Sequence, residues 1–192
     1  MERFARRYWH KSVIGLDSSL ASLKQAQLKT HGVYLNADAT HLPFKNRSFS
    51  LIISNGVIHH IPHYTQALQE ISRILKPKGQ LYLTIYNHSH PYRLVYNFFG
   101  LLRRLPHHNF IINLLAPLYW PIYALMCLIY LHYLPNFSET KSDLADRFFV
   151  PYARFFRHRE IHRLCRHHNF KILATSTHAL GTMTSYLFRK LG

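Results

Sequence analysis

Short apolar runs alternate with helix-like stretches along the first part of the chain. Two stretches, 18–30 and 64–75, repeat apolar side chains at helical spacing, and Ser18 or Ser19 is a candidate N-cap for the first. The apolar runs have the length of buried strands, and each ends in Asp or Asn: Ser12–Asp17, Val33–Asp38, Ser48–Asn55 and Gln80–Asn87. Strands separated by helices of this length predict an α/β fold with a mostly parallel sheet.

A long aromatic segment follows these elements. From Leu105 to Ser138 the chain contains no Asp, Glu, Lys or Arg. We expect Pro117 and Pro121 to break this segment near its middle. The segment is interpreted as a helical lid or an interfacial segment, with a membrane-spanning helix as the alternative.

The last third of the chain returns to regular patterns. Residues 157–179 read as helix, turn and strand, and 182–192 as a closing strand. The chain of 192 residues is therefore expected to form one domain. Its expected parts are a cofactor-binding core (12–90), an apolar helical insertion or lid (91–150) and a C-terminal helix with closing strands (151–192).

Short polar side chains stand at the ends of all four predicted strands, namely Asp17, Asp38, Asn55 and Asn87. Ligands of parallel sheets bind beyond these carboxyl ends. An acid after one strand can accept hydrogen bonds from ribose hydroxyls. An acid after the next strand, followed by small Ala39, can bond an exocyclic amine and leave room for a flat base. Asp17 and Asp38 therefore indicate an adenosine-bearing ligand.

Three segments carry a family resemblance. "VIGLDSS", "ADATHLPFKNRSFSLIISNGVIHHI" and "ALQEISRILKPKGQLYL" resemble consecutive motifs of the class I S-adenosylmethionine-dependent methyltransferases, in the small-molecule and lipid branch. The resemblance covers roughly residues 12–87 and implies a Rossmann-like fold. It implies that Asp17 and Ser18 bind the ribose side of S-adenosylmethionine, Asp38 and Ala39 the adenine, and Asn55 the methionine portion. The final helix and strands resemble the family's closing antiparallel hairpin.

The chain departs from the family at several positions. The family usually has Asp at Ser50 and Gly at Lys78. Its first strand and glycine-rich turn, which precede the strand that ends in Asp17, have no counterpart here, because residues 1–11 contain no glycine and supply at most a helix end. We expect an N-terminally truncated chain with unpaired backbone groups inside the sheet and poor binding of S-adenosylmethionine.

The charge leaves several kinds of partner open. The chain has 24 Lys and Arg against 8 Asp and Glu, a formal net charge of +16. This balance favours nucleic acid or an anionic membrane surface, or else a solvated basic face. The primary interpretation is methyl transfer to a small, apolar or lipid-like acceptor. The alternatives are an RNA methyltransferase and a non-catalytic membrane-peripheral or interaction module.

Cysteines and histidines add little to this picture. The two cysteines form no CxxC pair and fit a reducing compartment, so a cytoplasmic location is expected, with contact at the inner face of the membrane through 105–138. His158, His162 and Cys165 have helical spacing, but the surrounding arginines disfavour a metal, and no metal site is predicted. His59 and His60 follow Asn55 and are candidates for a catalytic base, or are loop histidines.

Overall fold

The computed structural model describes residues 13–105, 108–178 and 181–192. Ser12 and the helix end expected within 1–11 lie outside these ranges. The strands are β1 (Ile14–Asp17), β2 (Val33–Asn36), β3 (Phe49–Asn55), β4 (Leu75–Asn87), β5 (Phe155–Phe156), β6 (Phe170–His178) and β7 (Met183–Lys190). The helices are α2 (Leu20–Lys29), η1 (Ile58–His60), α3 (Tyr64–Ile74), α4 (Tyr92–Arg103), α5 (His108–Leu131), α6 (Phe137–Leu144), η2 (Ala145–Phe149) and α7 (His158–His167).

The predicted α/β class is confirmed, but the strands form two sheets. The larger sheet has the order β3-β4-β7-β6, with β3 parallel to β4 and the closing pair antiparallel, and β5 pairs with the end of β4. β1 and β2 form a separate parallel pair. Within the described ranges, β1 pairs only with β2 and β3 pairs only with β4, so each of them has one unpaired side. By the resemblance, the family's first strand lies between the strands that end in Asp17 and Asn55, and the two sheets are separate at that place.

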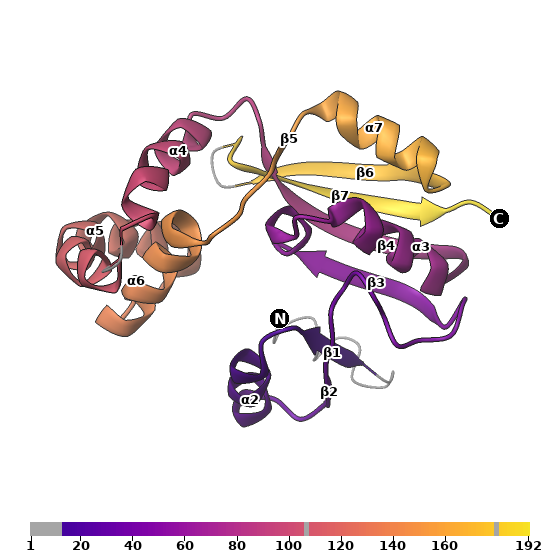
Figure 1. Cartoon of the computed structure of the whole chain (residues 1–192), viewed down its shortest axis with the longest axis horizontal. Helices are drawn as coiled ribbons and strands as arrows, with labels where there is room; N and C mark the ends of the chain where they lie inside the picture. Colours follow the sequence, from indigo (N-terminus) through magenta and orange to yellow (C-terminus); the bar gives the residue numbers. More distant parts are fainter. Residues whose placement is uncertain (1–12, 106–107, 179–180) are drawn as a thin grey trace.

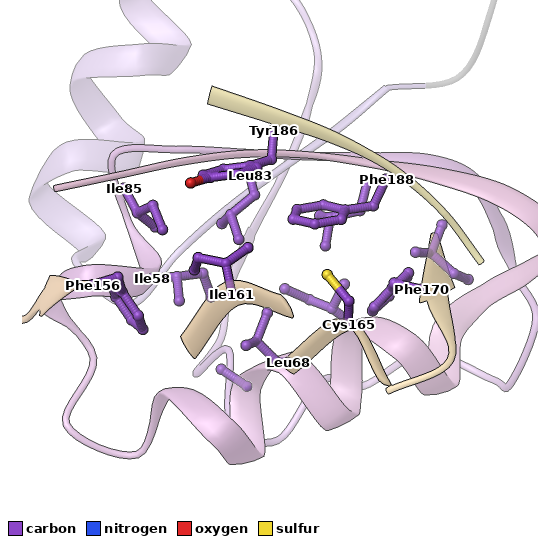
Figure 2. Close-up of a cluster of buried hydrophobic side chains, with 14 of the residues drawn as sticks. Ile58, Leu68, Leu83, Ile85, Phe156, Ile161, Cys165, Phe170, Tyr186 and Phe188 are labelled. Carbon is purple, nitrogen blue, oxygen red and sulfur yellow. The ribbon is translucent and has the colours of Figure 1, made fainter. Parts of the chain in front are cut away.

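The main core lies between the larger sheet and helices α3 and α7 (Figure 1). Helix α3 contributes one apolar face, on which Ala67, Leu68 and Ile71 are almost fully buried. Strands β4 and β7 contribute the residues that alternate onto the same side. Figure 2 shows side chains of α3, α7, β4 and β7 meeting in this layer, among them Leu68, Ile161, Leu83 and Phe188. The core therefore fixes the positions at which β3 and β4 end.

Helices α4, α5, α6 and η2 form a second group beside the sheet (Figure 1). A smaller core holds them together, formed by Ile112, Ala116, Leu144 and Phe149. The expectation that Pro117 and Pro121 break the aromatic segment was wrong, because both lie inside the continuous helix α5. Both prolines are on an exposed face, where the carbonyls that lose their helical donors can reach solvent.

Candidate functional site

Asp17 and Ser18 stand at the carboxyl end of β1, where the chain turns into α2. An Asp17 Oδ1 atom accepts the Ser19 N–H at 2.8 Å, and the Ser19 hydroxyl accepts the Ser22 N–H at 3.2 Å as the N-cap of α2. Of the two candidate caps, Ser19 is thus the one used. The Asp17 and Ser18 side chains are both exposed. The sequence places an exposed carboxylate at this strand end and fixes it through the start of the helix.

Asn36 links this turn to the end of β2. Its Nδ2 atom donates to the carbonyls of Asp17 and Ser18, at 3.0 and 2.9 Å, and the Ala37 N–H donates to the Asp17 carbonyl at 3.2 Å. These bonds hold the ends of β1 and β2 side by side. Asp38 comes two residues after Asn36, which pairs with Asp17. The role of Asn36 was missed from the sequence, although Asn at a strand end is a common cross-linking residue.

Asp38 is exposed and stays ionised. Its Oδ1 atom accepts the Thr40 N–H at 2.8 Å, and the hydrogen bonds from Thr40 lower the pKa of the carboxyl below its usual value. Ala39 is half-buried and packs against the main core, and Thr40 is buried. The loop therefore presents its carboxylate outward while Ala39 and Thr40 attach it to the body of the protein.

Glu70 and Arg73 of α3 hold the loop that follows Asp38. Glu70 Oε2 accepts the Leu42 N–H at 2.8 Å. The Arg73 guanidinium donates to the carbonyls of Leu42 and Phe44, at 2.9 and 2.7 Å, and to Asn46 Oδ1 at 2.8 Å. Sequence reasoning missed this pair, although its i, i+3 spacing on a predicted helix was a usable signal. The loop that carries Asp38 thus depends on two α3 side chains.

Asn55 ends β3 and its side chain is exposed. Gly56 follows with a φ of +75°, a conformation that favours glycine, and its N–H donates to the Thr84 carbonyl at 3.3 Å. Because β3 and β1 belong to different sheets, backbone pairing brings Asp17 and Asp38 together but does not bring Asn55 to them. Asn55 therefore stands at a strand end of its own.

Asn87, the fourth strand-end residue, has a structural role. Its Nδ2 atom donates to the Gly181 carbonyl at 2.6 Å, and its Oδ1 accepts from the Thr184 hydroxyl at 2.9 Å. Both partners lie in or next to β7. Asn87 therefore differs from the other strand-end residues, because its amide attaches β7 to β4.

His59 and His60 differ in access and hydrogen bonding. His59 is fully buried, its ring lies 3.9 Å from that of Tyr86, and neither ring nitrogen makes a normal hydrogen bond with a described residue. Desolvation lowers the pKa of His59 to about 3. His60 is half-buried, and its Nδ1–H donates to the Tyr152 carbonyl at 2.9 Å. That bond leaves the Nε2 atom of a neutral His60 as an acceptor.

The α7 histidines do not converge on the neighbouring cysteine. His158 and His162 are exposed and their Nε2 atoms lie 2.9 Å apart. Cys165 instead points into the main core (Figure 2), where desolvation raises the pKa of its thiol to about 11. Among the described residues, no group of three His, Cys, Asp or Glu side chains is placed to hold a metal.

The geometry fits the adenosine half of a cofactor. Two exposed carboxylates follow adjacent parallel strands, the Asp38 carboxyl is kept ionised, and small Ala39 follows it. Carboxylates in this arrangement can accept from ribose hydroxyls and from an exocyclic amine. A surface groove of about 420 Å3 adjoins the same loop, lined by Thr40, His41, Leu42, Gln66, Gln69 and Glu70, and these lining residues include neither carboxylate.

Residues 1–83 match the family model described as a methyltransferase domain. The ubiquinone/menaquinone biosynthesis C-methyltransferase UbiE of Bartonella quintana is 33% identical over 81 residues, which cover 40% of this chain and 31% of that protein. The chain thus spans about a third of the length of the curated relatives it matches.

Solved structures share the fold over most of the chain. A S-adenosylmethionine-dependent methyltransferase from Methanosarcina mazei has a TM-score of 0.56 at 16% identity, covering 93% of this chain and 82% of that one. Burkholderia thailandensis 1,6-didemethyltoxoflavin-N1-methyltransferase, with bound S-adenosylhomocysteine, has a TM-score of 0.54 at 14% identity, covering 94% and 62%. At these identities the likeness establishes a shared fold.

Proposed function

We propose that the chain belongs to the class I S-adenosylmethionine-dependent methyltransferases, and that its protein transfers a methyl group to a small, apolar or lipid-like acceptor. The observation that carries the proposal is the pair of exposed carboxylates, Asp17 and Asp38, held at adjacent strand ends by Asn36. The family match covers the same strands.

Five residues would hold the cofactor. Asp17 would accept from the ribose hydroxyls, with Ser18 beside it, and Asp38 would accept from the adenine amine over the small side chain of Ala39. Asn55 would lie next to the methionine portion. Glu70 and Arg73 would act as positioning residues, because they hold the loop that follows Asp38 without being at its carboxylate.

When bound, S-adenosylmethionine supplies a sulfonium-activated methyl group. Such a transfer requires the acceptor atom to be held in line, and the residues of the chain contribute mainly orientation. Where the acceptor must lose a proton, His60 is better placed than His59. The bond from Nδ1 to the Tyr152 carbonyl fixes the His60 tautomer and leaves Nε2 as the acceptor for that proton. Desolvation lowers the pKa of His60 as well, but His59 is fully buried and its pKa falls to about 3.

The surroundings of the β4 end favour an apolar acceptor. Tyr86, Tyr92 and Phe155 pack ring to ring there, and Phe148 of η2 contacts Tyr92. These rings are largely buried against one another, and they make the environment of the β4 end apolar, which suits a ring or a hydrocarbon chain. Relatives with quinone- and lipid-directed names agree with this chemistry, since they include UbiE and a phthiotriol/phenolphthiotriol dimycocerosates methyltransferase from Mycobacterium leprae.

The net charge of +16 supports RNA as a second candidate acceptor. Exposed arginines on α7 and its N-cap, Arg157, Arg159, Arg163 and Arg166, provide a basic surface. Basic surfaces of this kind bind phosphate backbones.

One experiment tests both acceptors. The protein is incubated with methyl-labelled S-adenosylmethionine, a lipid extract and total RNA, and the label is followed into each fraction. Label in the organic phase supports the proposal, and Asp38→Asn is expected to abolish it. Label in RNA alone establishes the second candidate. Label in neither fraction, at a S-adenosylmethionine concentration that shifts the amides of Asp17 and Ala39, overturns methyl transfer to both classes.

A further inference from the structure

The outer face of α5 is apolar along its whole length. A helix facing water ordinarily presents polar residues on its outer side. Here six exposed apolar positions repeat at helical spacing, with exposed fractions between 57% and 73%: Phe110, Leu114, Leu118, Ile122, Leu125 and Ile129. The helix lies at the edge of the molecule, with α4 and α6 on its other side (Figure 1). No described part of the chain covers this stripe.

The opposite face of α5 is fixed in place, so the helix cannot turn its apolar stripe inward. The Tyr119 hydroxyl donates to Asp143 Oδ2 of α6 at 2.6 Å, and that carboxylate also pairs with Arg147 at 2.6 Å. The Trp120 indole N–H donates to the Pro135 carbonyl at 3.1 Å. Ala116 is fully buried in the same interface. The exposed stripe is therefore a permanent feature of the fold.

The charge of the chain indicates which kind of partner binds this face. No Asp or Glu occurs between Glu70 and Glu139, and exposed Arg104 stands just before α5. Two copies of a chain with a net charge of +16 repel one another, whereas a bilayer with anionic headgroups attracts the chain. An exposed apolar helix face on a strongly basic chain is the composition of a helix that lies at a membrane surface.

We propose that α5 docks flat on an anionic lipid bilayer through its outer stripe. The 21 residues Asn109–Ile129 are long and apolar enough to cross a membrane, but two features oppose a span. The inner face of the helix carries the Tyr119–Asp143–Arg147 contacts, which a bilayer core would strip of their polar partners. Pro117 and Pro121 also leave the carbonyls of Asn113 and Pro117 without their helical donors. A flat orientation keeps the inner-face contacts within the protein, and it places the freed carbonyls at the headgroup level instead of in the bilayer core.

Docking of this kind would bring the protein to the layer in which apolar acceptors dissolve, but it does not depend on cofactor binding or methyl transfer. The proposal is therefore tested without either. Flotation is measured with vesicles of phosphatidylcholine alone and of phosphatidylcholine mixed with phosphatidylglycerol, at low and high salt. Binding is expected to require the anionic lipid and to weaken with salt.

Variants then assign the binding to the stripe. Leu114→Ser/Leu118→Ser/Ile122→Ser is expected to lower the partition coefficient at least tenfold. The matched control, Leu20→Ser/Leu28→Ser/Val33→Ser, removes three comparably exposed apolar side chains from α2 and β2 and should leave binding unchanged. Equal binding by the α5 variant and the wild type would overturn the proposal. So would a wild-type dimer that the α5 variant converts to monomer without any vesicle binding, because it assigns the face to a second copy.

Fluorescence depth measurements separate docking from spanning. The chain has two tryptophans, so Trp9→Phe leaves Trp120, near the middle of α5, as the sole reporter. Quenchers attached at shallow lipid positions should quench it more than deep ones. Stronger quenching from the bilayer centre would show a span and contradict the flat orientation.

Discussion

The Arg73 guanidinium lies 2.7 Å from the Glu70 carboxylate, and the two side chains together anchor the loop that carries Asp38. Glu70 takes a backbone N–H from this loop, and Arg73 donates to two of its carbonyls. The adenine side of the proposed site is therefore positioned from α3 and not from the β1–β2 pair alone. Two side chains of one helix thus hydrogen-bond the loop backbone and hold the loop against the main core.

Replacing Arg73 should loosen this loop. Arg73→Lys keeps the charge but loses the planar fork that reaches several acceptors at once. We expect amide hydrogen exchange at Leu42 and its neighbours to rise roughly tenfold, while the amides of β4 and β7 keep their protection. Gln69→Lys, on the same helix, serves as the control. Unchanged exchange in the loop of the Arg73 variant would show that the loop is held by other contacts.

The buried His59 should make stability depend on pH. Its pKa in the fold, about 3, is below the ordinary value of 6.5, so the unfolded chain takes up a proton first. Stability from neutral His59 is fully present above pH 6.5 and decreases as pH falls toward 3. The loss between pH 7 and pH 5 should be about 2 kcal/mol.

His59→Phe keeps a ring against Tyr86 and should remove about 2 kcal/mol of that pH-dependent loss, measured as the free energy of unfolding in urea. His162→Phe, exposed on α7, is the matched control and should retain the wild-type difference. If the two variants show the same pH dependence, His59 is not the buried neutral group described above.

Lys78 offers a site for stabilisation. It has a φ of +63°, in the left-handed region that favours glycine, and it lies in the irregular segment where β4 begins. Lys78→Gly should raise the free energy of unfolding by about 1 kcal/mol. Gly79→Ala should lower it, because a Cβ there would lie 2.8 Å from the Lys76 carbonyl oxygen. A destabilised Lys78→Gly variant would contradict this assignment of strain.

The sequence predicted local elements well and their assembly less well. Periodicity was enough for α3, β3 and the closing strands, and the Ser19 cap was a correct alternative for α2. The family departure at Lys78 agrees with its positive φ. The continuous helix through Pro117 and Pro121 was not predictable, because two prolines one turn apart break a helix by propensity alone. Here the packing of Ala116 and Tyr119 against α6 overrides propensity.

Partners distant in sequence explain the remaining differences. His59 and His60 are identical residues in one short segment, and only Tyr86 and Tyr152, brought in by the fold, make one buried and the other oriented. Asn87 could not be separated from the other strand-end residues until β7 was in place. The sequence thus indicates which side chains are candidates, while tertiary contacts decide their roles.

We propose that Asp17 and Asp38 form the adenosine half of a S-adenosylmethionine site, and amide NMR shifts on titration with adenosine and S-adenosylhomocysteine measure this binding. Both ligands, at up to millimolar concentration, should shift the amides of Asp17, Ser18 and Ala39. Asp38→Asn should abolish these shifts, and Glu139→Gln, an equal charge change on α6, should preserve them. Shifts confined to other parts of the chain, or shifts that survive Asp38→Asn, would show that these carboxylates do not hold the adenosine group.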